Sequence, residues 1–225
     1  MAHSLHRQNT LPMHLEMHED NFNLLKSVAQ EYYSYGAKYK SYHNWEHGTS
    51  VADTTTLILS AECPEFYDVS IVLAAIWHDA VYIAGAGEAI NEYASAAALT
   101  HTWNNYFIQE DPTILQRATR IIPLTSIGNH LISQNITDDL PHQILMDADL
   151  SSLSIDYEDF INNQAHIIIE NNGNPDSKED RNKCAKFLNM LATARPYIYH
   201  TTTARNWYEA KALKNIARYA EENKL

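Results

Sequence analysis

Histidine and aspartate side chains at three separate places in the sequence could together bind a divalent metal ion. The stretch Tyr42–His47 holds two histidines four residues apart, a His-Asp doublet stands at 78–79, and two acids lie within Asp147–Asp149. Imidazoles combined with carboxylates form a mixed nitrogen and oxygen ligand set that several divalent metals accept. A metal held in this way can activate water for hydrolysis. The histidine pair taken alone is more typical of a structural or surface position.

The residues around the doublet strengthen the metal interpretation. The segment from Ser70 to Ile83 is apolar almost all round, which predicts a buried, central helix. An imidazole and a carboxylate in such surroundings cost free energy unless a partner satisfies them, and a salt bridge or a capping role would be the alternative. The acids of 147–149 also lie in an apolar stretch without a basic neighbour. These acids therefore need a cation, or one of them must be protonated.

Hydrophobic periodicity and helix-boundary residues predict an all-α chain of about nine helices that would position these groups. Apolar residues recur at steps of three and four, and capping residues, glycine or proline end most segments. The expected helices cover residues 21–35, 48–61, 70–83, 88–108, 113–122, 139–150, 156–170, 178–195 and 204–222. No internal repeat or long linker divides the chain. We therefore expect one domain over residues 21–225, preceded by a polar, flexible leader over residues 1–20.

Composition excludes several classes of protein. The chain has 225 residues, of which 45% are hydrophobic, enough for a substantial core. Its 16 basic and 28 acidic residues give a formal net charge of −12, which disfavours nucleic acid and anionic membranes as partners. Only 6 glycines occur, which disfavours an all-β fold. Two unrelated cysteines and the lack of a signal peptide or membrane span favour the cytoplasm.

Four ordered motifs resemble those of the HD-domain superfamily of metal-dependent phosphohydrolases, and more narrowly a bacterial group of predicted HD phosphohydrolases. The motifs are a Tyr-His-Asn-x-x-His opening, a His-Asp-x-x-Tyr doublet, an Asn-Glu-x-x-Ser-Ala stretch and an Asp-x-Asp-Leu-Ser ending. They lie here at Tyr42–His47, His78–Tyr82, Asn91–Ala96 and Asp147–Ser151. The resemblance covers roughly residues 20–220. It implies an HD-type helical bundle that hydrolyses a small phosphate ester, for example a nucleotide.

The resemblance also implies a ligand set for one divalent metal ion. His47, His78, Asp79 and one of the last two aspartates would bind it. Asp149 is preferred because the final aspartate of the family is typically followed by Leu-Ser or a similar pair, and Asp147 is the alternative. The ion could be Mn, Fe, Co, Ni, Zn or Mg, since such a ligand set does not choose among them. It would lower the pKa of a bound water and offset charge on the phosphoryl group.

Other side chains are expected to act on the substrate. Glu92 would orient the attacking water or receive its proton, with a plain helix-surface role as the alternative. His43 would contact substrate or hold a ligand carboxylate. Together with Asp79 these two form the predicted catalytic set. Arg181 and Arg195 are the predicted contacts to the remaining phosphate oxygens.

Two other functions stay open at this point. A diiron oxidase or oxygenase would use additional histidines between the doublet and the last aspartate, and His101 and His130 stand in that interval. A catalytically idle sensor or scaffold would bind metal without turnover. In the favoured case the partner is a small phosphorylated substrate, with no nucleic acid and no membrane, and a homodimer is compatible with the sequence.

Overall fold

The computed structural model describes residues 15–87, 89–106, 109–126 and 139–224, and this part of the chain is helical. The predicted all-α fold is confirmed, with nine α-helices of nine residues or more among the described residues. These helices are α1 (Glu19–Ser34), α2 (Trp45–Glu62), α3 (Val69–Trp77), α4 (Ile90–Tyr106), α5 (Pro112–Ile121), α7 (Leu140–Asp149), α8 (Tyr157–Glu170), α9 (Lys178–Thr193) and α11 (Ala210–Glu222). The short helix α10 (Thr202–Ala204) and a π-helical turn (Arg205–Glu209) interrupt the last predicted helix just before α11.

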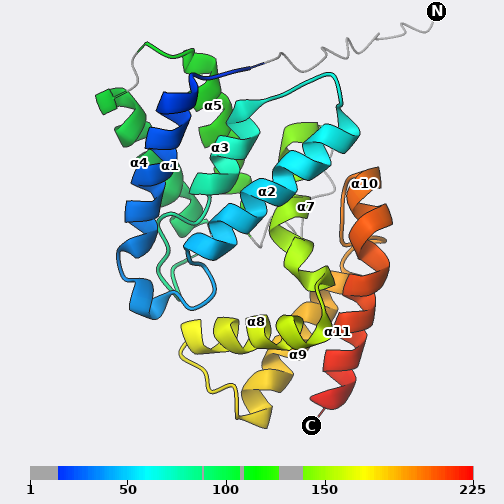
Figure 1. Cartoon of the computed structure of the whole chain (residues 1–225). Coiled ribbons are helices and arrows are strands. Elements are labelled where there is room, and N and C mark those ends of the chain that lie inside the picture. Colours follow the sequence, from blue (N-terminus) through cyan, green and yellow to red (C-terminus); the bar gives the residue numbers. More distant parts are fainter. Residues whose placement is uncertain (1–14, 88, 107–108, 127–138, 225) are drawn as a thin grey trace, which may run out of the picture.

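The most apolar helix, α3, forms the centre of the bundle. All of its residues are buried, and α1, α2, α4, α5 and α7 pack around it. Figure 1 shows this group in the upper part of the molecule, with α8 and α9 below it. Helix α11 packs against both α8 and α9 and so holds the lower group together. The bundle thus consists of a main group around α3 and a smaller group that faces its lower end.

Helix α3 ends earlier than the sequence predicted, at Trp77 instead of Ile83. The amide of Ala80 donates to the carbonyl of Trp77, so the chain tightens into a turn at this point. The hydroxyl of Ser95 on α4 then bonds both the amide and the carbonyl of Val81, replacing the bonds that a longer helix would have made. The His-Asp doublet therefore lies on the turn after α3, and the expectation of a doublet inside the helix is wrong.

The leader predicted over residues 1–20 falls mainly on residues 1–14, outside the described residues. Within the described part, Leu15 is buried and its backbone pairs with Tyr67 and Val69 at the start of α3. Helix α1 begins at Glu19. Leu15, within the predicted leader, is therefore already packed against the start of α3. Residues 88, 107 and 108, which were assigned to the fourth helix, also lie outside the described residues.

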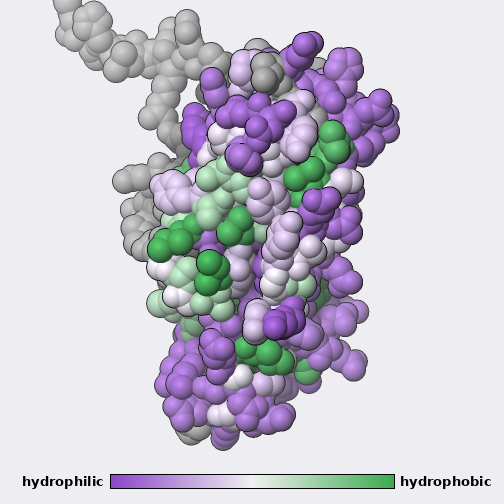
Figure 2. Space-filling view, turned by 90° about the vertical axis from the view of Figure 1, so that its left-hand side faces the viewer, coloured by the Kyte–Doolittle hydropathy of each residue, from purple (hydrophilic) through white to green (hydrophobic). Residues whose placement is uncertain are grey.

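Large apolar side chains are exposed at several places among the described residues. Figure 2 shows one side of the molecule, hydrophilic at both ends and with its apolar residues gathered around the middle. Within the described part of the chain, no helix combines the length and the apolar character needed to cross a bilayer.

Gly48, in the first turn of α2, offers a test of how tightly this fold is packed. A Cβ atom here would come within 2.6 Å of the Tyr33 hydroxyl and 2.8 Å of its Cζ. Because Tyr33 is buried, we expect Gly48→Ala to lower the free energy of unfolding by about 1–3 kcal/mol, although alanine favours helices. Urea unfolding measures this, with the exposed Ser50→Ala of the same helix as control. An unchanged free energy would show that Tyr33 can move aside.

Candidate metal centre

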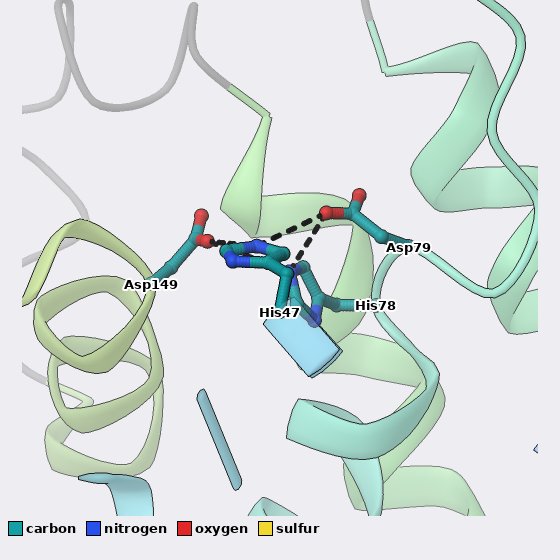
Figure 3. Close-up of side chains that lie close together, drawn as sticks. All are labelled: His47, His78, Asp79 and Asp149. Carbon is teal, nitrogen blue, oxygen red and sulfur yellow. Dashed lines mark ion pairs between the residues drawn. The ribbon is translucent and has the colours of Figure 1, made fainter. Parts of the chain in front are cut away.

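Four side chains from three parts of the fold converge at the lower end of the main group. His47 comes from the first turn of α2, His78 and Asp79 from the turn after α3, and Asp149 from the last residue of α7. One ligand atom from each lies within 4.8 Å of all the others. Figure 3 shows the four side chains pointing toward one another. This cluster could hold a metal ion.

The nitrogen and oxygen atoms of the cluster surround a common point. His78 Nε2 lies 2.9 Å from an Asp79 oxygen and 3.4 Å from an Asp149 oxygen. His47 Nε2 lies 3.2 Å from the same Asp149 oxygen and 3.5 Å from the Asp79 oxygen. Both Nε2 atoms are buried, and among the described residues neither has a hydrogen bond of acceptable geometry. The cluster is therefore close in space but not satisfied by its own hydrogen bonds.

The backbone of α3 fixes which nitrogen of His78 faces the cluster as a lone pair. His78 Nδ1 lies 2.7 Å from the carbonyl oxygen of Ala75. Since a carbonyl oxygen only accepts, Nδ1 carries the hydrogen, and Nε2 of the neutral ring is left as an acceptor. This acceptor faces the carboxylate oxygens of Asp79 and Asp149. Lone pairs that face one another at these distances need a cation between them. In addition, metal-binding histidines typically donate their other ring N–H to a carbonyl or carboxylate, as His78 Nδ1 does to Ala75.

The pKa values of the histidines and of Asp149 also indicate that the cluster favours a positive charge. Burial by itself would lower the pKa of His78, but the Asp79 and Asp149 carboxylates outweigh it and raise that pKa well above its ordinary value. The pKa of His47 is raised by the same two acids against the same effect of burial. In turn, the two imidazoles hold the pKa of Asp149 far below its usual range despite its burial. The site therefore stabilises a cation, whether a proton or a metal ion.

Local sequence explains why His47 reaches the cluster. Asn44 caps α2, and its side-chain oxygen accepts from the amide of His47 at 3.1 Å. The helix thus begins at Trp45, three residues before the predicted start, and His47 falls in its first turn. The ring of Tyr42 packs against the His47 ring, with their centroids 4.8 Å apart. Both contacts fix the direction of the imidazole.

Asp147 and Asp149 have separate roles in the structure. Asp149 belongs to the cluster, whereas the fully buried Asp147 accepts from the amides of His200 and Thr201, both at 2.7 Å. Burial raises the pKa of Asp147 to about 6, although these amides counteract the rise. Asp147 thus anchors the segment before α10 onto α7. The preference for Asp149 over Asp147 as the last ligand agrees with this geometry.

A cavity of about 1000 Å³ opens onto the cluster. His78, Asp79 and Asp149 line it, and so do the predicted catalytic residues His43 and Glu92. Glu92 lies in the first turn of α4. Burial, aided by the charges of Asp79 and Asp149, raises the pKa of Glu92 above its ordinary value. The structure therefore brings the predicted catalytic set and three of the four cluster residues to one cavity.

His43 is oriented by an acid that the sequence analysis did not single out. The buried Glu170, at the end of α8, contacts His43 Nδ1 with one oxygen, and its other oxygen accepts from the amides of His43 and Tyr42. The ring of Tyr82 stacks on that of His43 at 4.0 Å. A carboxylate at a helix C-terminus is unfavourable for the helix dipole, which was the available signal for a special role of Glu170.

Lys40 is a second residue that the sequence analysis missed. Its side chain is buried, and Nζ lies 3.4 Å from the carbonyl oxygens of Tyr32 and Ala80. Burial lowers the pKa of this ammonium group, while the nearby Asp79 and Glu170 partly oppose that shift. Lys40 thus ties the turn that carries the His-Asp doublet to α1. A lone lysine in a polar stretch gives no sign of burial in the sequence.

The two predicted phosphate-binding arginines lie elsewhere. Arg181 bonds the Asn223 side chain and the carbonyl of Pro175, and Arg195 bonds His200 and the carbonyl of Ile198. Neither is among the residues that line the cavity, so the structure does not bring them to the cluster. Their guanidinium groups instead donate to carbonyl oxygens in the segments that precede and follow α9. Among the lysines that the structure describes, Lys183 lines the cavity.

The extra histidines invoked for a diiron centre are not in the described cluster. His101 is exposed on α4 and contacts Asn105, whereas His130 lies outside the described residues. Comparison of the chain with protein-family models, curated proteins and solved structures found no match. The functional argument therefore depends on the geometry of the site and on the motifs of the sequence.

The two aspartates of α7 provide a matched test of the metal centre. We expect Asp149→Asn to abolish stoichiometric metal binding with little effect on folding. Asp147→Asn should keep metal binding but lower the free energy of unfolding by about 1–3 kcal/mol, because one buried amide loses its acceptor. Calorimetric titration with Zn²⁺ and urea unfolding of both variants measure these effects. If only Asp147→Asn lost metal binding, Asp147 and not Asp149 would be the ligand.

Proposed function

We propose that the protein is a metal-dependent phosphohydrolase of the HD type that hydrolyses a small phosphate ester. The observation that carries this proposal is the lone pair of His78 Nε2, fixed by the Ala75 carbonyl and directed at two carboxylates. His47 completes a set of two imidazoles and two carboxylates, which suits a divalent ion of the first transition series. The HD-like motifs of the sequence, which contain these four residues, support the same proposal.

His47, His78, Asp79 and Asp149 would hold the ion beside the cavity. When bound, such an ion lowers the pKa of an adjacent water and offsets the negative charge of the phosphoryl group. The protein must then position the ester, accept a proton from the attacking water and supply one to the leaving oxygen. The phosphorus–oxygen bond to the organic group breaks as the bond to the water oxygen forms.

Two residues of the cavity suit the proton transfers. Glu92, with its raised pKa, is suited to accept the proton of the attacking water. His43 contacts Glu170 through Nδ1, so that when both ring nitrogens carry hydrogen it can give its Nε2 proton to the leaving oxygen of the ester. The stacked ring of Tyr82 restricts rotation of the His43 ring. In this role Glu170 is a positioning residue that acts through His43.

Metal content and phosphatase activity test the proposal together. We expect about one divalent ion per chain in protein purified without added metal, and hydrolysis of 4-nitrophenyl phosphate. His78→Gln should lose the ion and lower kcat/KM by more than about 100-fold, since even indirect changes around a metal cost 10–100-fold. His101→Gln, on the exposed face of α4, should match the wild type. Two irons per chain, or one ion without hydrolysis of any phosphate ester, would contradict the proposal.

The pH dependence of the rate tests the role of Glu92. The carboxylate must be ionised to accept a proton, so the rate should fall as the pH drops through the pKa of Glu92. Because burial raises that pKa, this decline should lie at higher pH than an exposed glutamate would give. Glu92→Gln should remove the decline and lower kcat by about 10²–10⁴-fold. Glu65→Gln, at an exposed position, is the control, and an unaltered profile in Glu92→Gln would exclude this role.

A further inference from the structure

We infer that the substrate carries a single phosphoryl group on a largely apolar organic group, and that this organic group binds between α8 and α9. The inference rests on the proposed function and narrows its substrate class. It draws on the part of the cavity remote from the metal ligands, on the charges of its lining and on one buried amide. A nucleoside triphosphate, with its polar base and several phosphates, does not fit these features.

Six apolar side chains of α8 and α9 line part of the cavity, beside the charged Asp180 and Lys183 of α9, and we call this part the apolar chamber. Its walls are Ile167 and Ile168 from α8 and Cys184, Phe187, Leu188 and Leu191 from α9. Burial raises the pKa of the Cys184 thiol to about 11, so this side chain is neutral at physiological pH and serves as another apolar wall. The chamber is continuous with the space around Asp149 and His78, because one cavity contains both. A molecule with its phosphate at the metal centre would therefore place its organic group against these walls.

The charges around the cavity limit the substrate to one phosphoryl group. Four carboxylates line the cavity, those of Asp79, Glu92, Asp149 and Asp180. The ammonium of Lys183 lies 3.0 Å from acidic oxygens of both Glu179 and Asp180 and is already neutralised. A divalent ion would balance only two of the carboxylates. No described arginine lines the cavity, so a second or third phosphate would meet an acidic wall without a cationic partner.

A buried glutamine adds an uncharged polar group to the apolar chamber. Gln164 of α8 is 3% exposed and lines the cavity. Its amide oxygen accepts from the Cys184 thiol, with 3.5 Å between the oxygen and the sulfur. Among the residues that the structure describes, its amide nitrogen donates to none. Because this nitrogen is a free donor in the lining of the cavity, we expect the organic group to present one acceptor, such as a carbonyl or ether oxygen, at this point.

Binding of phosphonates, which are not hydrolysed, tests the chamber without relying on turnover. In calorimetric titrations of Mn²⁺-loaded protein, 2-naphthylmethylphosphonate should bind at least about tenfold more tightly than methylphosphonate, because its ring buries apolar area. Phe187→Ala should remove most of this difference and leave metal content unchanged. Met190→Ala, on an exposed part of the same helix, is the matched control. Gln164→Leu should remove any preference for a 4-acetylphenyl over a 4-ethylphenyl phosphonate.

Hydrolysis provides the second part of the test. Aryl monophosphates should be better substrates by kcat/KM than methyl phosphate and than nucleoside di- and triphosphates. Equal affinity for the two phosphonates, identical behaviour of the Phe187→Ala and Met190→Ala variants, or efficient turnover of triphosphates would overturn the inference. If no ester is hydrolysed but the naphthyl phosphonate still binds more tightly in a Phe187-dependent manner, the proposed hydrolysis fails and the apolar chamber stands.

Discussion

Two imidazoles and two carboxylates packed together away from water form the interaction on which the rest of the structure depends. His47, His78, Asp79 and Asp149 come from three distant segments of the chain, and each would be costly to bury alone. The backbone bond from His78 Nδ1 to Ala75 prevents Nε2 of the neutral ring from donating to its acidic neighbours. A proton on the imidazoles or a bound metal ion would complete the cluster. The ends of α2, α3 and α7 meet where they do because this cluster joins them.

Buried charged groups next to the ligands hold the segments that carry them. Asp147 fixes the chain before α10 to α7, two residues before the ligand Asp149. Glu170 fixes the turn before α2 through the amides of residues 42 and 43. Lys40 bonds the carbonyl of Ala80, just after the doublet. In each case a buried charge satisfies backbone groups that a loop would otherwise leave unpaired, so the ligands stand on rigid supports although three of them lie at helix ends.

The sequence predicts the helices and the four residues of the cluster because both depend on local patterns. The apolar run of α3 and the acids in α7 are visible without coordinates, and Asp149 is separable from Asp147 by its following residues. The end of α3 at Trp77 was missed because the Ser95 hydroxyl, from another helix, replaces its last hydrogen bonds. Glu170 and Lys40 were missed for the same reason, since their partners lie 127 and 40 residues away in the chain. The sequence shows the positive charge of Arg181 and Arg195 but not the direction in which each side chain points in the fold.

The acidic character of the chain has a consequence for how a phosphate could enter the cavity. With a net charge of −12 and four carboxylates around the cavity, the protein repels anions until a cation is bound. Under the proposed function, binding of the metal ion and binding of the phosphate would be coupled, because each would reduce the electrostatic cost of the other. The apolar walls between α8 and α9 add attraction that does not depend on charge. An ester with one phosphate and an apolar group would be attracted both by the bound cation and by the apolar walls. Each additional phosphate would add repulsion without adding apolar contact.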